Sequence, residues 1–277
     1  MNRFKVGATS ANLGIGFDCL GLALELFNEY ETELSFKDEI KGFANDCDDD
    51  NLFLYAYHQT ARYLGLEDDH VKIHAKCDIP VSRGLGSSAA LIVGGIYAYS
   101  ILHGNCLDKE TMLKIASAIE GHPDNVAPAI YGNLCIVHRN MLKNIEIDRR
   151  WKIGLWIPDY EVSTAKARAV LKNEYARAEV VNNVSAAMLA IEALKDFDLD
   201  GISCIMDDLI HEPYRRSLLK DFEKLKDYAL NKGAKAFVIS GSGSTCLSLS
   251  DKPLQIEYEN MIYKEVKVNS GGIIYVQ

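Results

Sequence analysis

The chain has 277 residues, enough for two modest domains or one large one with a substantial buried core. It carries 30 Lys and Arg against 39 Asp and Glu, a formal net charge of −9, and no basic block offsets the acidic excess. This charge balance argues against nucleic acid as the main partner. An anionic ligand would therefore need a local positive field.

The cysteines and the apolar runs indicate the redox environment of the protein and whether it enters a membrane. Seven cysteines are scattered along the sequence and never form a Cys-x-x-Cys pair. We therefore expect neither a disulfide framework nor a zinc site, and a reducing, cytoplasmic environment. The N-terminus has no signal-peptide pattern, and the longest apolar run, about residues 89–102, is shorter than the roughly 18 residues of a membrane span. These features predict no membrane role.

Hydrophobic spacing in the first half predicts both strands and helices. We expect, in order, a short strand at 3–6, a long small-residue loop at 7–18, paired strands at 20–26 and 30–36, an acidic solvated loop at 46–50, a helix at 52–64, a strand at 71–77 with outward Lys72, His74 and Lys76, a buried helix from 87 to about 102, a helix at 108–120 and a rigid polar loop at 120–129. Asp50 or Asn51 should cap the helix at 52–64, and Asp108 the helix at 108–120.

The second half continues with a similar mixture. Strands at 134–138 and 151–158 flank a charged turn at 143–150, where we place the boundary between domains 1–150 and 151–277. We then expect helices at about 164–171, 184–197, 203–211 and 218–233, a strand at 236–239, a small-residue turn at Ser240–Thr245, a strand from Cys246, an amphipathic helix near 255–263 and short C-terminal strands. This content predicts the α+β class.

One glycine-rich stretch has the chemistry of an anion site. It consists of Pro80, Val81, Ser82, Arg83, Gly84, Leu85, Gly86, Ser87, Ser88, Ala89 and Ala90. Glycines permit a tight turn and close approach of a ligand to the backbone. The helix that follows directs unpaired N–H groups and its positive dipole end toward that turn. Phosphate is the commonest occupant of such a site.

Three familiar phosphate motifs do not fit this stretch. Gly84-x-Gly86-x-x-Ala89 formally satisfies the dinucleotide fingerprint, which requires a strand directly before the glycines and an acidic strand end about twenty residues later. Here Pro80 and Ser82 separate the strand from the glycines, and the later region follows a helix. Gly-Lys-Ser/Thr, His-Arg-Asp and Asp-Phe-Gly do not occur, which excludes the Walker A and protein-kinase motifs.

Phosphoryl transfer also needs a metal ligand and a partner for the acceptor hydroxyl. Ser88 and Glu120 suit Mg²⁺, which takes few protein ligands. Asp124 or Asn125 could hydrogen-bond an acceptor hydroxyl. His122 could act as a base or be structural, and its residue type does not separate the two.

Several segments together resemble the GHMP kinases, which phosphorylate galactose, homoserine, mevalonate and phosphomevalonate. Pro80–Ala90 is similar to their phosphate loop, and Ser240–Thr245 to their C-terminal glycine loop. Ala8–Gly21 and Glu120–Ala129 resemble the corresponding segments of the homoserine branch. The occurrence of these segments in this order is much more specific than any one of them.

The resemblance implies a role for each matching residue. ATP would lie on Pro80–Ala90, with Asn51 as a further nucleotide contact, and Mg²⁺ on Ser88 and Glu120. Homoserine would be bound by Asn12, Asp18, His122, Asn125, Thr164, Arg168, Arg215 and Gly241. Asp18 would take its ammonium group, the two arginines its carboxylate, and Asn125 its hydroxyl. The base would lie near Asp124, or the γ-phosphate would accept the proton.

The catalytic set implied is Ser88, Glu120, Asp124 and Asn125. Simpler readings exist for several of these residues: Asp18 in a turn, Thr164 as a helix cap, and Arg168 and Arg215 as solvated charges. Taken with the whole set of motifs, we favour the functional reading.

The fold implied has an N-terminal domain like that of ribosomal protein S5 and a ferredoxin-like C-terminal domain. The activity implied is ATP-dependent phosphorylation of homoserine on the way to threonine, with a homodimer left open. The alternatives are another kinase of the family, acting on mevalonate or a sugar, and a non-catalytic nucleotide-binding regulator. Gly7, Asn133 and Ser244 depart from the family pattern, and none removes a charge or donor that the mechanism needs.

Overall fold

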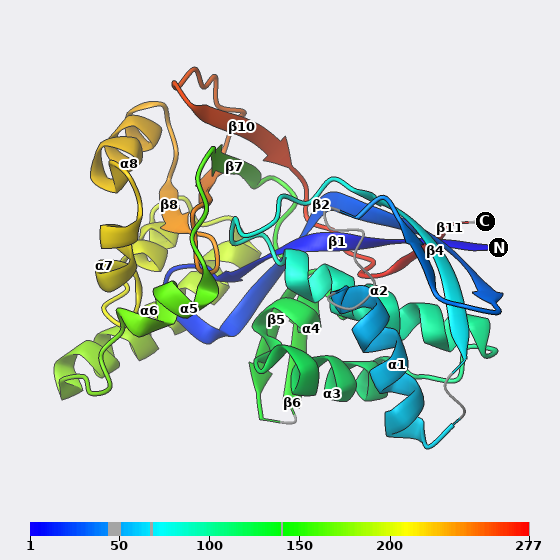
Figure 1. Ribbon diagram of the computed structural model, residues 1–277. Helices are drawn as coiled ribbons and strands as arrows, with labels where there is room; N and C mark the ends of the chain where they lie inside the picture. Colours follow the sequence, from blue (N-terminus) through cyan, green and yellow to red (C-terminus); the bar gives the residue numbers. More distant parts are fainter. Residues whose placement is uncertain (44–50, 67–68, 140, 277) are drawn as a thin grey trace.

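The computed structural model describes residues 1–43, 51–66, 69–139 and 141–276, which fold around two β-sheets (Figure 1). The acidic run at 46–50, with Cys47, lies outside the described residues. The other six cysteines form no disulfide among the described residues. No helix in the described part of the chain is long and apolar enough to cross a membrane.

The first sheet contains both ends of the chain (Figure 1). Its strands are β1 (Asn2–Asn12), β2 (Gly16–Ser35), β3 (Glu39–Lys41), β4 (His70–Cys77), β5 (Leu134–His138), β6 (Met141–Ile145) and β11 (Ile274–Val276). Its order is β11-β1-β2-β4-β3, and β5 pairs with both β2 and β6. In β4, Lys72, His74 and Lys76 are exposed between buried neighbours, which confirms the predicted alternation.

Four helices pack beside this sheet: α1 (Leu52–Leu64), α2 (Ser87–Leu102), α3 (Lys109–Glu120) and α4 (Pro123–Tyr131). α2 is apolar on nearly every side and is buried between its neighbours, as predicted. Asn51 caps α1, because its side-chain oxygen accepts from the backbone N–H groups of Phe53 and Leu54. Asp108 caps α3 in the same way, through the N–H of Thr111.

The second sheet has the order β10-β7-β9-β8 with every pair antiparallel. Its strands are β7 (Lys152–Pro158), β8 (Ala236–Ile239), β9 (Cys246–Ser250) and β10 (Met261–Val266). In chain order this is the 4-1-3-2 arrangement expected of a ferredoxin-like domain. Between β7 and β8 lie α5 (Thr164–Ala169), α6 (Arg177–Asp196), the 3₁₀ helix η2 (Gly201–Met206), α7 (Glu212–Arg215), η3 (Arg216–Leu218) and α8 (Phe222–Asn231).

Two predictions for the start of the chain were wrong. Most of the expected loop at 7–18 belongs to β1 and β2, which leave only residues 13–15 between them. The two strands expected at 20–26 and 30–36 are one continuous strand. Asn28, which falls between the two expected strands, lies within β2, where its side chain accepts from the N–H of Ile79 and donates to the hydroxyl of Tyr30.

The segment expected as a rigid loop at 120–129 is mostly helix α4. Pro123 occupies the first turn of this helix, where its missing N–H costs nothing and its φ is already helical. The charged turn expected at 143–150 is also shorter, because Met141–Ile145 pairs with β5.

In the second half, two predicted helices were wrong. The helix expected at 203–211 is η2 followed by irregular chain, because the Asp208 carboxylate binds the N–H groups of His211 and Glu212 and begins α7 instead. The helix expected near 255–263 does not exist. Ile256 and Tyr258 pack in extended chain against the second sheet's core, and the carbonyl of Glu257 accepts from the hydroxyl of Tyr228.

Other helix boundaries moved by a few residues. α6 begins seven residues before the expected start at 184, and α8 begins at Phe222 after η3. The chain passes from the first sheet to the second between β6 and β7, which supports our proposal of a boundary near residue 150. The last strand, β11, returns to pair with β1.

Candidate active site

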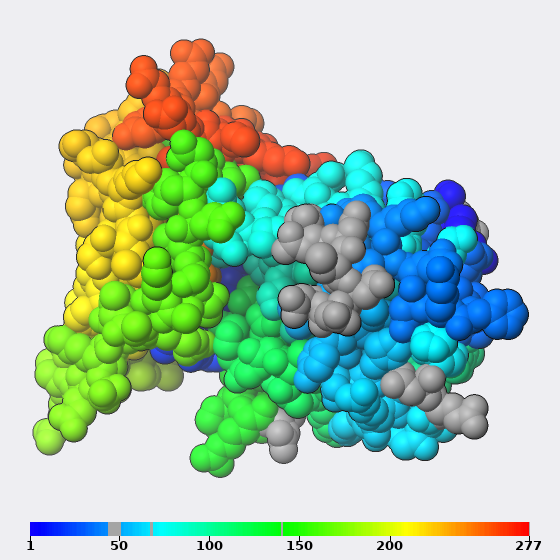
Figure 2. Space-filling view, viewed as in Figure 1, coloured from blue at the N-terminus to red at the C-terminus, as the bar shows by residue number. Residues whose placement is uncertain are grey.

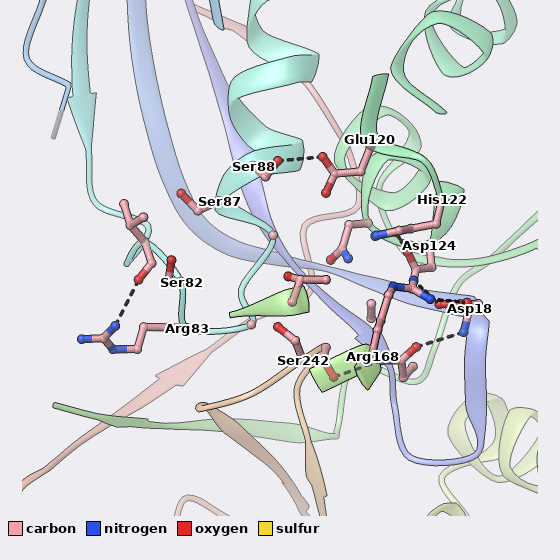
Figure 3. Close-up of a pocket in the computed structure, with 18 of the residues that line it drawn as sticks. Asp18, Ser82, Arg83, Ser87, Ser88, Glu120, His122, Asp124, Arg168 and Ser242 are labelled. Atoms are coloured by element: carbon pink, nitrogen blue, oxygen red, sulfur yellow. Dashed lines mark hydrogen bonds and ion pairs between the residues drawn. The ribbon is translucent and has the colours of Figure 1, made fainter. Parts of the chain in front are cut away.

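A cavity of about 270 Å³ lies where the two parts of the chain meet. Figure 2 shows this region as a recess beside the green segment near residue 165. Figure 3 shows its lining, which comes from the ends of β1 and β2, the phosphate loop, α3, α4, α5, α7 and the Ser240–Thr245 turn. Segments far apart in the sequence therefore share one cavity.

The phosphate loop is held against the second glycine turn. Gly84 has φ +70°, and an added Cβ would lie 2.2 Å from the carbonyl oxygen of Ser240. The hydroxyl of Ser240 donates to the Gly84 carbonyl at 2.7 Å, and the N–H of Thr245 donates to the Arg83 carbonyl at 3.1 Å. Gly86 begins α2 at φ +66°, and its Cβ would lie 2.0 Å from Thr9 Oγ1. Both glycines are thus required by close approach and by positive φ.

Arg83 points away from the helix end and toward the second sheet (Figure 3). Its guanidinium donates to the carbonyl oxygens of Pro158 and Asp159 and lies 3.1 Å from Glu161 Oε1. These bonds tie the phosphate loop to the end of β7. The structure therefore gives Arg83 an anchoring role in the loop.

Ser88 and Glu120 face each other across the top of the cavity (Figure 3). The Ser88 hydroxyl donates to Glu120 Oε2 at 2.7 Å. Burial raises the pKa of the Glu120 carboxyl above its ordinary value, although the Ser88 hydrogen bond opposes the shift. A bound cation would offset that burial and favour the carboxylate.

His122, Asp124 and Asn125 stand at the start of α4. His122 Nδ1 donates to Asp124 Oδ1 at 2.6 Å, and Asp124 is buried. This hydrogen bond raises the pKa of His122 above its ordinary value, so the imidazole holds its proton more firmly. Thr9 donates its hydroxyl hydrogen to Asn125 Oδ1 at 2.8 Å, which orients the amide.

Asp18 and Arg168 form a two-pronged ion pair on the side opposite the phosphate loop (Figure 3). The two N···O distances are 2.8 and 3.0 Å, and each side chain is about one-third exposed. Asn12 supports the pair, because its Oδ1 accepts from the N–H of Asp18 and its Nδ2 donates to the Gly241 carbonyl. Asn12 and Asp18 both have positive φ, so this turn is shaped around their side chains.

Arg215 is buried below that pair. It donates to the carbonyl oxygens of Ala167 and Gly241 at 3.2 and 2.8 Å. Burial is the main cause that lowers its pKa to about 10, at which the guanidinium is still charged at neutral pH. The guanidinium groups of Arg215 and Arg168 lie over the ring of Phe17, at 5.1 and 5.7 Å from its centre.

His211 connects Arg215 to the turn between β1 and β2. Its Nε2 lies 2.5 Å from the Gly14 carbonyl oxygen, which can only accept, so Nε2 carries the hydrogen. Its Nδ1 therefore accepts from Arg215 Nη1, at 3.4 Å. Burial lowers the pKa of His211 to about 4, which agrees with a neutral ring. The ring also stacks on Phe17.

Most predicted site residues line the cavity together. These are Asn12, Asp18, Val81, Ser82, Arg83, Gly84, Gly86, Ser87, Ser88, Glu120, His122, Asp124, Asn125, Thr164, Arg168, Arg215 and Gly241. Five predicted site residues do not line the cavity: Pro80, Leu85, Ala89, Ala90 and Asn51. Leu85, Ala89 and Ala90 are core residues, and Asn51 is the cap of α1. Ser163, not Thr164, caps α5.

The sequence reasoning missed several contributors. Ala11, Leu52, Leu91 and Ser242 also line the cavity. His211 and Phe17 act from behind it, through Arg215. Ser242 lies in a turn that the sequence had already marked, but an apolar residue such as Leu91 carries no separate signal in a buried helix.

Comparison with known proteins agrees with this arrangement. The description "GHMP kinases N terminal domain" matches residues 51–133, and "GHMP kinases C terminal" matches residues 190–262. A homoserine kinase of Clostridium acetobutylicum is 38% identical over 273 residues, covering 95% of this chain and 91% of the relative. A homoserine kinase of Picosynechococcus is 36% identical, covering 89% and 86% respectively.

Solved structures give the same assignment. The crystal structure of homoserine kinase from Cytophaga hutchinsonii has a TM-score of 0.87 and 27% identity, covering 99% of this chain and 97% of that one. A mevalonate kinase of Methanococcus jannaschii has a TM-score of 0.72 at 15% identity, over 96% and 98% of the two chains, which shows a shared fold. The chain therefore belongs to the GHMP kinase family and, within it, to the homoserine kinases.

Proposed function

We propose that this protein is a cytoplasmic enzyme that transfers the γ-phosphoryl group of ATP to the hydroxyl of L-homoserine. The products are ADP and O-phospho-L-homoserine, an intermediate of threonine biosynthesis. The observation that carries the proposal is one cavity with two kinds of lining. At one end are backbone N–H groups and a helix N-terminus; at the other are a carboxylate and two guanidinium groups, which suit a zwitterionic amino acid.

The triphosphate would lie against Gly84–Ser88 and the start of α2. Ser88 and Glu120 fit Mg²⁺, because a hydroxyl and a carboxylate are oxygen ligands and already lie within 2.7 Å of each other. Among the described residues no group of three His, Cys, Asp or Glu side chains could hold a metal. The pair would thus supply two ligands, and a bound Mg²⁺ would neutralise charge on the phosphates.

Homoserine would enter by ion exchange with the Asp18–Arg168 pair. Its ammonium group would take the place of Arg168 beside Asp18, and its carboxylate would face the guanidinium groups of Arg168 and Arg215. The Asp18–Arg168 ion pair would be replaced by two, one between Asp18 and the ammonium group and one between the arginines and the carboxylate. Little charge would then be left unpaired. A substrate without an ammonium group, such as mevalonate, would leave Asp18 without a cation.

Asn125 would orient the acceptor hydroxyl, because Thr9 binds its Oδ1 and the Nδ2 hydrogens can face the substrate. Asp124 holds the Nδ1 hydrogen of His122, so Nε2 is the nitrogen of the neutral ring that could accept a proton. The hydroxyl proton would go to Asp124 or to the transferred phosphoryl group. Catalysis would then rest mainly on positioning and charge stabilisation.

The direct test is ADP release with ATP·Mg²⁺ and one acceptor at a time: homoserine, mevalonate, galactose or none. We expect release above the blank with homoserine alone. Equal release with mevalonate or galactose would favour a different kinase of the family. ATP binding without turnover for every acceptor would favour a regulator.

A variant separates the roles within the site. Glu120→Gln should lower kcat by roughly 100-fold and leave homoserine KM nearly unchanged, because the residue faces the phosphate end. Glu110→Gln is the matched control, since Glu110 is an exposed carboxylate of the same helix.

A further inference from the structure

The last residues of β1 carry two fully buried hydroxyl groups, on Thr9 and Ser10. Because successive side chains of a strand point to opposite faces, these hydroxyls lie on opposite sides of β1. The hydroxyl of Ser10 meets that of Ser240 at 2.8 Å, in the second glycine turn. Thr9 instead contacts the start of α2 and the start of α4. Its side chain therefore stands between the ends of the two helices that line the cavity.

Thr9 is joined to the phosphate loop by its backbone and by close packing. Its N–H donates to the carbonyl oxygen of Leu85 at 3.1 Å. Its Oγ1 lies where a Cβ on Gly86 would have to fit, so the bare backbone at the start of α2 packs directly on the threonine hydroxyl. A β-branched side chain has few χ1 rotamers, so the backbone bond and the packing together hold this hydroxyl in one place.

The same hydroxyl orients the amide of Asn125, which lines the cavity. It donates its hydrogen to Asn125 Oδ1 at 2.8 Å. With Oδ1 occupied in this way, the Nδ2 hydrogens are left to donate to the oxygen of an acceptor hydroxyl. An amide rotated by half a turn would present Oδ1 instead. Because Oδ1 only accepts, it would take the hydrogen of the acceptor hydroxyl and direct it away from Asp124 and from the transferred phosphoryl group.

We propose that Thr9 is a positioning residue for phosphoryl transfer, which fixes the orientation of the Asn125 amide and its place relative to the phosphate loop. One buried hydroxyl thus ties the part of the site that holds the acceptor to the part that holds ATP. Loss of this hydroxyl acts on the chemical step more than on the binding of either substrate, because the substrates bind mainly through other groups. The inference rests on the proposed function, which assigns the acceptor hydroxyl to Asn125.

Steady-state kinetics with ATP·Mg²⁺ and homoserine test the role of the hydroxyl. Thr9→Val, which keeps the branched shape, and Thr9→Ala, which cannot crowd Gly86, should each lower kcat by about 30-fold and leave both KM values within about threefold of the wild type. Thr9→Ser keeps the hydroxyl and should keep kcat within about threefold. Thr32→Val is the matched control, with wild-type kinetics expected. Thr32 is also fully buried in the first sheet, and among the described residues its hydroxyl has no hydrogen-bond partner.

A double-mutant cycle tests whether Thr9 acts through Asn125. Adding Thr9→Ala to Asn125→Ala should lower kcat by less than about threefold further, because the amide that Thr9 orients is already absent. A further loss as large as that of Thr9→Ala alone overturns the proposal. So does a wild-type kcat in Thr9→Ala, or a Thr9→Ser variant as slow as Thr9→Ala. A wild-type protein without homoserine-dependent ADP release would instead contradict the proposed function.

Discussion

The two ends of the cavity are built in different ways. The phosphate end is shaped mainly by backbone: Gly84 and Gly86 at positive φ are pressed against Ser240 and Thr9 so closely that no Cβ fits. The amino-acid end consists of charged side chains from elements far apart in sequence, chiefly Asp18 and Arg168. The phosphate end is formed by shape and dipoles, and the amino-acid end by paired charges.

Because of this difference, substitutions at the two ends should impair different properties of the enzyme. A change at Gly84 or Gly86 should disturb backbone packing, so stability and ATP use should fall together. A change at the amino-acid end should leave the fold largely intact and act on the homoserine KM.

Gly84→Ala should have the largest effect. The added Cβ would contact the backbone oxygens of Ser240 and Gly243 at less than 3 Å, so the two glycine turns must separate. We expect the free energy of unfolding to fall by about 3 kcal/mol and kcat/KM for ATP by about 100-fold or more. Chemical denaturation and steady-state kinetics measure the two losses.

Gly65→Ala is the control for Gly84→Ala. Gly65 has a similar positive φ but nothing within 4 Å of the added Cβ. The Gly65→Ala variant should lose only about 1 kcal/mol of its free energy of unfolding and keep the wild-type kcat/KM for ATP. Equal losses in the two variants would show that φ strain, not the contact between the turns, controls the phosphate end.

Arg215→Ala should raise the homoserine KM by about 30-fold or more and change the ATP KM little. The buried guanidinium bonds to Ala167 and Gly241 and would meet the substrate carboxylate. Arg215→Lys, which keeps the charge but loses the fork, should recover part of the loss. Arg216→Ala is the matched control, because that neighbour faces Glu212 and Glu223. An ATP-only effect would contradict the assignment.

Substitutions of His211 should have a smaller effect, because this residue positions Arg215. His211→Gln can still donate to the Gly14 carbonyl, and His211→Asn can still accept from Arg215, so each keeps one of the two bonds. We expect a homoserine KM raised by about tenfold in His211→Asn and His211→Gln, with kcat within about threefold of the wild type. A loss of stability with an unchanged homoserine KM would mean that His211 contributes to packing and does not position Arg215.

The smallest effect concerns pH. Burial lowers the pKa of His211 to about 4 from its ordinary 6.5. Between pH 6.5 and 4 the imidazole therefore binds a proton in the unfolded chain but not in the folded one. The free energy of unfolding declines as the pH falls through this range. Burial raises the pKa of Glu212 to about 7 from 4.5, so its contribution is present at low pH and is lost as pH rises from 4.5 to 7. Between 4.5 and 6.5 the two slopes oppose each other.

Variants should expose each slope. Glu212→Gln should gain stability as pH rises from 4.5 to 6.5, and His211→Asn should lose stability over the same range, each by about 2 kcal/mol. Thermal unfolding at several pH values measures both. Slopes of the same sign in the two variants would contradict the protonation states assigned to the buried pair.

The two ends also differ in how far the sequence predicts them. The phosphate end is local, so Gly84 and Gly86 could be identified from one stretch and a helix start. The contact between that stretch and Ser240 is long-range, and only the fold shows it. At the other end, Asp18 and Arg168 are 150 residues apart, and their pairing with each other was not foreseen.

Secondary-structure prediction failed where local sequence signals conflicted with hydrogen bonds made in the folded chain. Asn28 falls in the gap between two expected strands and lies inside one continuous strand, where its side chain is bonded within the core. Asp208 looked like part of a helix, but its carboxylate instead binds the N–H groups that begin α7. In both cases a polar side chain binds backbone or side-chain groups that no local pattern reveals.

Substrate analogues that lack one charged group test whether the amino-acid end recognises both the ammonium group and the carboxylate. We would measure kcat/KM for homoserine, for γ-hydroxybutyrate, which lacks the ammonium group, and for n-propanolamine, which lacks the carboxylate. In the wild type each analogue should be at least about 100-fold poorer, and Asp18→Asn should remove most of the preference over γ-hydroxybutyrate. An equally good γ-hydroxybutyrate, or an unchanged preference in Asp18→Asn, would contradict the account.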